Sequence, residues 1–338
     1  MNYLVTGGSG FVGQSLCKNL IKKGHNVFNI DIITSNYNKI HNFQTNILNK
    51  NSLEQIFKNY KFDVIIHACA EVPVTKSKDF FLVNVDGTKN IINLFKKYFV
   101  KKLVYISSSA VYGVPKKTPI TERDKREPVE NYGKSKKRGE DLCFKEMSRG
   151  SNITIIRPRT IIGGARLGIF SYLFEWIQNN IDVPILNNGH NKYQFVNIED
   201  LVESVVISSK IDFVGDLNIG SSKFTTLREN LSELIKYAQS SSRLRNINST
   251  YLFRFANLLQ IIGILPLQDY HFKAYGAEIY FDTAKSKKVL NWASRFSDMQ
   301  SFKQCYKNYF SLDKNLVQSP HNKKLKNIFI KYSPYFIF

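Results

Sequence analysis

The sequence is poor in cysteine, poor in acidic residues and free of long apolar runs. Its four cysteines are scattered, and no two of them form a Cys-x-x-Cys pair. This spacing argues against a structural zinc site or a disulfide framework and suits a reducing compartment, so we expect a cytoplasmic protein without a metal. The N-terminus shows no signal-peptide pattern, because an expected strand starts almost at Met1.

No apolar run reaches the length of a transmembrane helix. The best candidate, residues 251–267, is interrupted by Arg254, Asn257 and Gln260. Such a segment covers a substrate cleft or makes a weak peripheral contact with a membrane surface, and we favour the cleft. The sequence therefore predicts no transmembrane segment.

Acidic residues are outnumbered: 27 Asp and Glu stand against 48 Lys and Arg, and the formal net charge is +21. The basic residues occur in small groups along the chain, and the sequence has no recognition helix or RNA-binding signature. We therefore expect no nucleic-acid partner. We favour a lysine-rich surface with a general attraction for anionic ligands such as nucleotides.

The N-terminal residues follow a recognisable order. The first thirteen, MNYLVTGGSGFVG, predict a short strand, a glycine turn and the start of a helix. Gly7 would allow the turn, Gly10 would let a phosphate approach the backbone, and Gly13 would let helix and strand pack closely. The next expected strand, NVFNID, ends on Asp31, near the spacing of a carboxylate that binds ribose. Since a helix N-terminus after a glycine turn binds phosphate, we predict a dinucleotide site.

Expected strands and helices alternate through the first half of the chain. This alternation predicts an α/β fold of the Rossmann type, with a doubly wound parallel sheet. The expected strands are residues 3–5, 26–31, 61–67, 102–107 and 153–157, and the expected helices are residues 80–98, 132–147, 170–178, 226–237 and 250–262. Residues 195–208 and 216–219 are expected to return to the sheet.

The expected domain organisation follows from this pattern. The dinucleotide-binding domain would span residues 1–165, and residues 192–220 would return to it. A smaller, discontinuous substrate lobe would be built from residues 166–191 and 221–312. The last segment, residues 313–338, is basic and aromatic and would form a C-terminal extension.

Tyr132 and Lys136 stand four residues apart in YGKSK, so on a helix both side chains lie on one face. A phenol has a pKa near ~10 and needs a neighbouring positive charge to act as a base at neutral pH. An ammonium group about 4 Å away in a partly shielded site supplies the required energy, on the order of 4 kcal/mol. Taken alone, this spacing is more typical of an exposed helix face. The segment SSSAVYG favours a site, because it follows an expected strand end, where α/β sheets bind ligands.

Together, these motifs resemble those of the extended short-chain dehydrogenase/reductases, in particular the NAD-dependent epimerase/dehydratase branch with its 4-epimerases. The motifs that carry the resemblance are, in chain order, TGGSGFVG, Asp31, HACA (67–70), NVDGTKN (84–90), SSSAVYG (107–113), YGKSK (132–136), RPRTIIGG (157–164) and FVNIEDLV (195–202). The resemblance covers residues 1–220 well and continues more weakly to residue 292.

The resemblance implies a catalytic set of Ser108, Tyr132 and Lys136, with Ser109 as the alternative to Ser108. Tyr132 would be the general base and acid, and Lys136 would lower its pKa and bind the nicotinamide ribose. Asp31 would hold the adenosine ribose hydroxyls, which favours NAD over NADP. The residues expected to bind NAD are Gly7, Gly10, Phe11, Val12, Gly13, Asp31, Asn46, Ile47, Ala68, Ala70, Asn84, Ser107, Tyr132, Lys136 and Pro158.

Three positions depart from the family pattern. Asn46 stands where an acid usually meets the adenine, and its amide oxygen can still accept a hydrogen bond. Ser109 and Ala110 replace the Asp-Glu pair of the sugar 4,6-dehydratases, so we expect no dehydratase activity. Residues 193–195, YQF, replace the Arg-Asp-Phe of many sugar epimerases, whose arginine binds the nucleotide phosphates, and Lys192 is adjacent.

The resemblance implies an NAD-dependent enzyme that oxidises a secondary alcohol or reduces its ketone. Epimerase-like chemistry on a nucleotide sugar is our first hypothesis. A ketoreductase or hydroxysteroid-type dehydrogenase is the alternative, and a non-catalytic NAD-binding scaffold is the third. We also expect a homodimer, because members of the family commonly dimerise through a helix pair. We expect His67 to be a packed residue at a strand end rather than a catalytic one.

Overall fold

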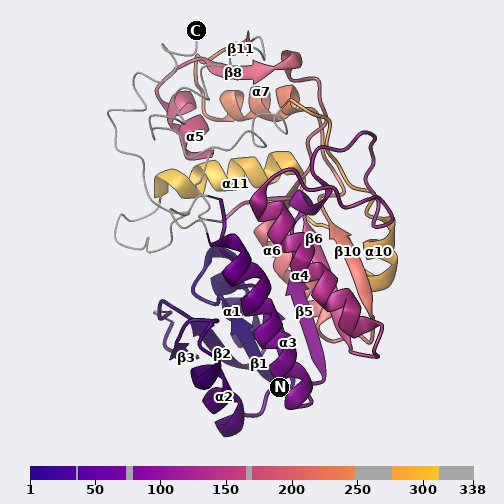
Figure 1. The fold of residues 1–338 in the computed structure, drawn as a ribbon. Helices are drawn as coiled ribbons and strands as arrows, with labels where there is room; N and C mark the ends of the chain where they lie inside the picture. Colours follow the sequence, from indigo (N-terminus) through magenta and orange to yellow (C-terminus); the bar gives the residue numbers. More distant parts are fainter. Residues whose placement is uncertain (36, 74–78, 165–169, 248–275, 312–338) are drawn as a thin grey trace.

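A computed structural model describes residues 1–35, 37–73, 79–164, 170–247 and 276–311 (Figure 1). Within these ranges, seven parallel strands form the central sheet, in the order β10-β6-β5-β4-β1-β2-β3. The strands are β1 (Asn2–Thr6), β2 (Asn26–Asp31), β3 (Ile40–Gln44), β4 (Val64–His67), β5 (Lys102–Ile106), β6 (Ile153–Pro158) and β10 (Gly215–Ile219). This order is that of a doubly wound sheet of the Rossmann type, as the sequence predicts.

Helices cover both faces of this sheet, and each face has its own apolar core. The covering helices are α1 (Phe11–Lys22) and α6 (Ile198–Ser208) on one face, and α2 (Lys50–Asn59), α3 (Thr88–Lys97) and α4 (Asn131–Met147) on the other. Successive side chains of a strand point to opposite faces, so in β1 Tyr3 and Val5 join the first core and Leu4 the second. Burial on both faces explains the continuous apolar runs of the central strands.

A smaller core lies at one end of the sheet, in the upper part of Figure 1. Its elements are β7 (Thr160–Ile162), α5 (Phe170–Gln178), β8 (Val183–Leu186), β9 (Phe195–Asn197), α7 (Leu227–Tyr237), β11 (Leu244–Ile247) and α11 (Asp298–Ser311). Strand β7 pairs with β9, and β8 with β11, both in parallel. Phe174, Phe195 and Phe302 are among its buried side chains. A further helix, α10 (Ala284–Leu290), adds its buried Leu290 to the core of the main sheet.

The prediction that residues 195–208 return to the central sheet is wrong. Phe195–Asn197 forms β9 in a separate two-stranded sheet, and Ile198–Ser208 is helix α6. The apolar run is misleading because α6 is itself packed on the sheet, where Leu201 and Val205 have no exposed surface. The second segment expected to return does so, as β10 beside β6.

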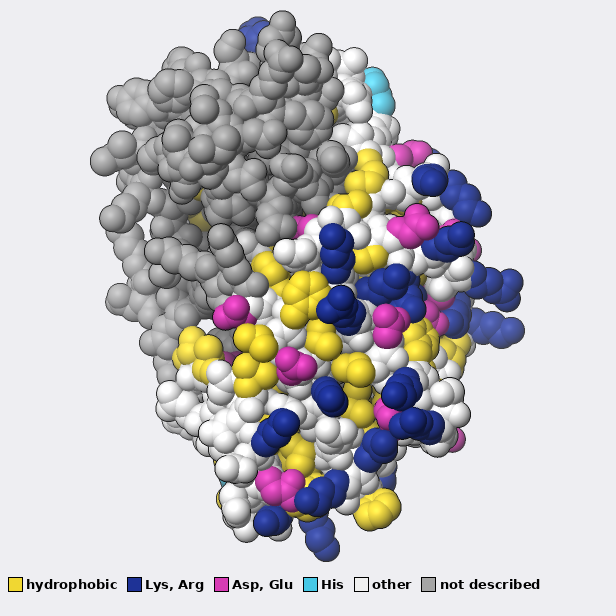
Figure 2. Space-filling model, in the orientation of Figure 1, with side chains coloured by type: hydrophobic (Ala, Val, Ile, Leu, Met, Phe, Trp, Pro, Cys, Tyr) yellow, Lys and Arg dark blue, Asp and Glu magenta, His cyan; other side chains and the backbone are white. Residues whose placement is uncertain are grey.

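Three features expected from the sequence lie outside the described residues: the helix over 250–262, the apolar segment 251–267 and the extension 313–338. In the part of the chain that is described, no helix has both the length and the apolar character needed to cross a bilayer. On the face shown in Figure 2, Lys and Arg side chains are spread widely with acidic residues between them, rather than gathered into one patch.

Candidate active site

The glycine turn after β1 has the conformation that the sequence predicts. Gly7 has a φ of +73°, which favours glycine, and its N–H donates to a carbonyl oxygen of β2 at 2.8 Å. A Cβ atom on Gly13 would overlap the carbonyl oxygen of Gly7, so only glycine lets α1 approach the loop this closely. Gly10 is the N-cap of α1, and Phe11 and Val12 begin its first turn. A glycine turn that opens a helix in this way is the arrangement that binds a phosphate in other proteins.

Asp31 lies beside the same loop, at the end of β2. Its carboxylate accepts hydrogen bonds from the N–H of Ser9 at 3.0 Å and of Ile33 at 3.2 Å. Burial raises the pKa of Asp31, and these backbone hydrogen bonds partly oppose that rise. Asn29, also on β2, donates to the Ser9 hydroxyl at 3.0 Å and accepts from the Gly8 N–H at 2.8 Å. Strand β2 therefore holds the glycine loop in place, with a carboxylate beside it.

The helix expected over residues 80–98 is present without a break, but its first half contains a π-helical turn. Leu82–Gly87 (η1) is a π-helix, and α3 follows it. A π-helical turn is rare and frequently marks a functional site, because it changes the direction of the side chains within it. Asn84 lies inside this turn and is completely buried.

The Asn84 side chain holds the backbone that follows β4. Its amide oxygen accepts from the Glu71 N–H at 2.8 Å, and its Nδ2 donates to the Glu71 carbonyl oxygen at 3.0 Å and to the Ser135 hydroxyl at 2.9 Å. Asn84 thus ties the segment that contains Ala68 and Ala70 to helix α4. Its side chain positions this backbone, which is the part of the segment predicted to contact NAD.

Four further residues predicted to bind NAD have side chains engaged within the protein. Asn46 is exposed, and its amide oxygen accepts a backbone N–H of its own turn at 2.9 Å. Ile47 is buried in the core, and Pro158 is buried at the end of strand β6. The Ser107 hydroxyl donates to Glu140 at 2.6 Å. Contact between NAD and any of these residues stays a prediction, and for Ser107 and Pro158 it would use the backbone.

Two glycines bring α4 close to the end of β5. A Cβ atom on Gly133 would lie 2.6 Å from a carbonyl oxygen of the 3-10 turn Ser109–Tyr112 (η2), and one on Gly139 would overlap a tyrosine hydroxyl of β5. Ser108 is the N-cap of η2, and Tyr132 lies in the first turn of α4. The structure therefore brings the elements that carry these two residues into contact.

Lys136 lies between the two glycines and is 2% exposed. Its Nζ donates to the carbonyl oxygen of Ile106, the last residue of β5, at 2.7 Å and lies 4.9 Å from the centre of the Tyr105 ring. Burial lowers the pKa of Lys136 to about 8, so the ammonium form dominates at pH 7. A buried charge is unfavourable for stability, and groups of this kind concentrate at functional sites.

Tyr132 precedes Lys136 by one helical turn and is half-buried. Its ring lies edge-on to that of Phe80, with 6.3 Å between the ring centres. Ser108 is also half-buried, and its hydroxyl oxygen accepts the Ala110 N–H at 3.2 Å. All three predicted catalytic residues therefore lie on two packed elements at the carboxyl end of β5.

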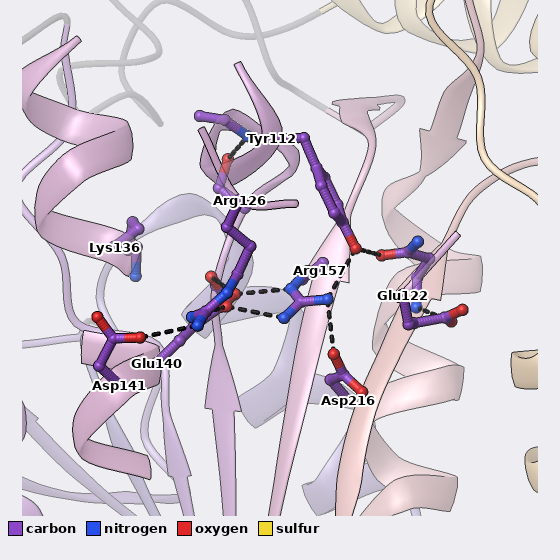
Figure 3. Close-up of polar contacts among 12 residues, drawn as sticks. Tyr112, Glu122, Arg126, Lys136, Glu140, Asp141, Arg157 and Asp216 are labelled. Atoms are coloured by element: carbon purple, nitrogen blue, oxygen red, sulfur yellow. Dashed lines mark hydrogen bonds and ion pairs between the residues drawn. The ribbon is translucent and has the colours of Figure 1, made fainter. Parts of the chain in front are cut away.

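A charged network that the sequence analysis missed lies next to this site (Figure 3). Glu140, one turn after the site lysine, accepts from Nε and Nη2 of Arg157, both at 2.8 Å, and from Nη1 of Arg126 at 3.0 Å. Arg157 also donates to the Tyr112 hydroxyl at 2.7 Å and pairs with Asp216 at 2.7 Å. The sequence held one signal of this network, since an arginine within the apolar strand ITIIRP requires a buried anionic partner.

His67, at the end of β4, is a packed residue, as predicted. It is completely buried, with Nδ1 2.6 Å from the Thr6 hydroxyl and Nε2 2.9 Å from the Thr88 hydroxyl. Burial lowers the pKa of His67 to about 3, so the ring is neutral. Across the described ranges, no group of three His, Cys, Asp or Glu side chains is arranged to hold a metal ion.

Comparisons with known proteins bear on the family and the fold of this chain. The sequence model of the NAD dependent epimerase/dehydratase family matches residues 3–220. The chain is 36% identical to the uncharacterized protein y4nG of Sinorhizobium fredii, over 98% of this chain and 85% of that one. It is 26% identical to a UDP-glucuronate 4-epimerase of Thermodesulfobacterium geofontis, over 89% of this chain and 94% of that one. The solved UDP-glucose 4-epimerase of Thermotoga maritima has the same fold, with a TM-score of 0.74 and 22% identity over 92% of this chain and 99% of that one.

Proposed function

The chain belongs to the NAD dependent epimerase/dehydratase family, and from that premise we propose that it inverts a secondary alcohol of a nucleotide sugar. The observation that carries this proposal is the position of Lys136. Its buried ammonium group is held at the carboxyl end of β5, one helical turn from Tyr132, on a helix that packs against η2. The family is NAD-dependent, and NAD is the cofactor.

The residues of the glycine loop fit this cofactor. The absence of side chains at Gly7 and Gly13 lets the loop and α1 pack together, and the positive end of the α1 dipole, at the Gly10 N-cap, would favour a pyrophosphate. The Asp31 carboxylate would hold the hydroxyls of the adenosine ribose. Its negative charge would repel the 2′-phosphate of NADP.

Replacing Gly13 by alanine tests this assignment. The new methyl group would overlap the Gly7 carbonyl oxygen, so α1 must move away from the loop. We expect NAD affinity, measured by calorimetry, to fall at least about tenfold and the free energy of unfolding to fall by about 1–3 kcal/mol. Gly150→Ala is the control, because Gly150 also has a positive φ, +89°, but no described atom lies within 4 Å of its Cβ position. Equal NAD affinities for the two variants would contradict the assignment.

The reaction that we propose begins with removal of a proton. The ammonium of Lys136 favours the phenolate form of Tyr132, which then takes the proton of the substrate hydroxyl. The Ser108 hydroxyl donates a hydrogen bond to the same substrate oxygen and fixes its position. NAD, when bound, supplies the hydride acceptor and donor for the carbon that bears this oxygen. Tyr132 returns the proton when the alcohol forms again, so the protein ends each cycle unchanged.

The turn after β5 favours epimerisation over water elimination. Ser109 and Ala110 follow Ser108, and neither carries a carboxyl group that could act as acid or base. Relatives described as 4-epimerases of UDP-sugars point to inversion at C4.

Tyr193 replaces the arginine that the family pattern predicts, and its hydroxyl lies 3.0 Å from the Thr160 hydroxyl. Binding of the nucleotide phosphates would therefore use other residues.

A stereochemical assay tests the proposed function. We expect the purified chain, incubated with NAD and a panel of nucleotide hexoses, to invert one of them without accumulating NADH. Product stereochemistry is followed by NMR, and NADH by absorbance. Stoichiometric NADH would instead indicate a dehydrogenase, and no reaction despite bound NAD would indicate a scaffold.

A further inference from the structure

Arg159 is a second buried arginine, just after the end of β6. It is 2% exposed, and its Nη1 donates to the Ser109 hydroxyl at 2.9 Å. Its guanidinium carbon lies 4.9 Å from the centre of the Tyr193 ring and 5.5 Å from that of Phe281. The Nε and Nη2 atoms of Arg159 are buried and find no hydrogen-bond partner among the residues that the structure describes. The cation is thus fixed in place while one edge of its planar fork is unused.

In Arg157, the corresponding edge of the guanidinium group binds a carboxylate. Its Nε and Nη2 bind the two oxygens of Glu140, each at 2.8 Å. In the described part of the chain, no carboxylate lies within ion-pair distance of Arg159, whereas Arg157 pairs with two. The charge of Arg159 does act on Asp298, but burial raises the pKa of Asp298 to about 8. Asp298 is not within ion-pair distance of Arg159, so its carboxyl group does not bind the unused edge.

We propose that the unused edge of Arg159 binds a carboxylate on the sugar, so that the substrate is a nucleotide-linked uronic acid. This inference rests on the proposed function and names the substrate class. A guanidinium fork matches a carboxylate with two parallel hydrogen bonds, and a buried cation without a counterion is unfavourable until such a ligand arrives. Ser109, which Arg159 contacts, follows directly on Ser108, the hydroxyl proposed to bind the reacting oxygen.

The chemistry of the sugar ring favours the carboxylate over the diphosphate as the ligand. In a hexuronic acid that reacts at C4, the carboxyl group is attached to C5, the neighbouring ring carbon. The diphosphate is attached to C1, on the other side of the ring. Arg159 contacts Ser109, the residue after Ser108, so its guanidinium group would lie nearer to the carboxyl group than to the diphosphate. A phosphate oxygen would satisfy the same donors, so the experiment must separate the two anions.

The test compares UDP-glucuronate, UDP-glucose and UDP as ligands of the full chain saturated with NAD. Affinities are measured by calorimetry, and epimerisation of both sugars by NMR. We expect the wild type to prefer UDP-glucuronate and Arg159→Met to weaken its binding by about 10- to 100-fold. Affinities for UDP-glucose and UDP should stay within about threefold of wild type, and Arg159→Lys should restore part of the preference.

A stability measurement shows whether the variant has merely lost its fold. Arg159→Met removes an unpaired buried charge, so its melting temperature should not fall below that of the wild type. Arg157→Met is the matched control two residues away, and it should melt earlier because Glu140 loses its main partner. A lower melting temperature for Arg159→Met would indicate a structural role and overturn the proposal.

The ligand series separates the remaining outcomes. Equal weakening of all three ligands by Arg159→Met would assign Arg159 to the diphosphate and overturn the proposal. A wild type without preference for UDP-glucuronate would overturn it as well. A third outcome separates the two proposals. If the wild type prefers UDP-glucuronate and Arg159→Met does not, but the wild type epimerises neither sugar, the inference about Arg159 stands and the proposed function fails.

Discussion

Replacing Tyr132 by phenylalanine is expected to abolish turnover while NAD binding persists. The substitution removes only the hydroxyl oxygen, and Tyr132 is half-buried in the first turn of α4, so the helix should keep its place. Loss of a general base typically lowers a rate by about 10²- to 10⁴-fold. Turnover is measured on the nucleotide sugar that the wild type inverts, and NAD affinity by calorimetry.

The control for this variant is Tyr98→Phe. The Tyr98 hydroxyl donates to Glu54, on α2. Tyr98 follows the C-terminal end of α3, whereas Asn84 precedes its N-terminal end, so the contact lies away from the candidate site. We expect normal turnover from the control. Near-normal turnover of Tyr132→Phe would rule out the proposed mechanism, and loss of NAD binding by that variant would show that the phenol is needed to bind the cofactor.

The physical basis of this expectation is the charge on Lys136. A phenol needs a shift of about three pKa units to act as a base near pH 7, which corresponds to about 4 kcal/mol. Burial keeps water from screening the ammonium and lowers the pKa of Lys136 only to about 8, so the charge is retained at neutral pH. The protein thus bears the cost of a buried cation at the position where that cation can stabilise a phenolate.

Much of the sheet could be predicted from local patterns. The strand expected over residues 26–31 is β2, and the helix expected over residues 132–147 is α4 with one more residue. Strand β3, Ile40–Gln44, was missed because it is an edge strand in which only Ile40 is buried, so its sequence lacks an apolar run. Helix α2 was also missed, although Leu53, Ile56 and Phe57 are spaced to form one apolar face.

The parts of the candidate site that depend on local sequence alone could be predicted. The run of glycines directly after the first strand indicates a turn, and Tyr132 and Lys136 share a helix face by spacing alone. Arg159 and Glu140 could not be assigned in this way, because their roles depend on which partners the fold brings near them. Glu140 meets its arginine across two elements. Within the described residues, Nε and Nη2 of Arg157 face an acid, whereas the same two atoms of Arg159 have no hydrogen-bond partner.

Glu140→Gln is expected to lower the free energy of unfolding by about 3–5 kcal/mol, because it leaves Arg157 buried without its main counterion. Glu140 has no exposed surface and accepts hydrogen bonds from Ser107, Arg126 and Arg157. A glutamine amide has one oxygen, so its NH₂ group must face a donor in this network. The measurement is equilibrium unfolding in urea at pH 7.

The same variant should change the pH dependence of turnover, which a purely structural role would not explain. The negative charge of Glu140 raises the pKa of Lys136 against the effect of burial. Without that charge, the pKa of Lys136 falls below about 8, and the ammonium is lost at lower pH. Since the charged form activates Tyr132, turnover should decline at a lower pH than in the wild type.

Asp141→Asn is the matched control for Glu140→Gln, because Asp141 is the next residue of α4 and binds the same Arg126, at 2.8 Å. Its side chain is 49% exposed, so water screens the pair and the expected loss is below about 1 kcal/mol. The two carboxylates share a helix and an arginine and differ mainly in burial. Similar losses for the two variants would show that the buried network adds no more to stability than an exposed ion pair. The charge of Glu140 would then affect the pKa of Lys136 but not the free energy of unfolding.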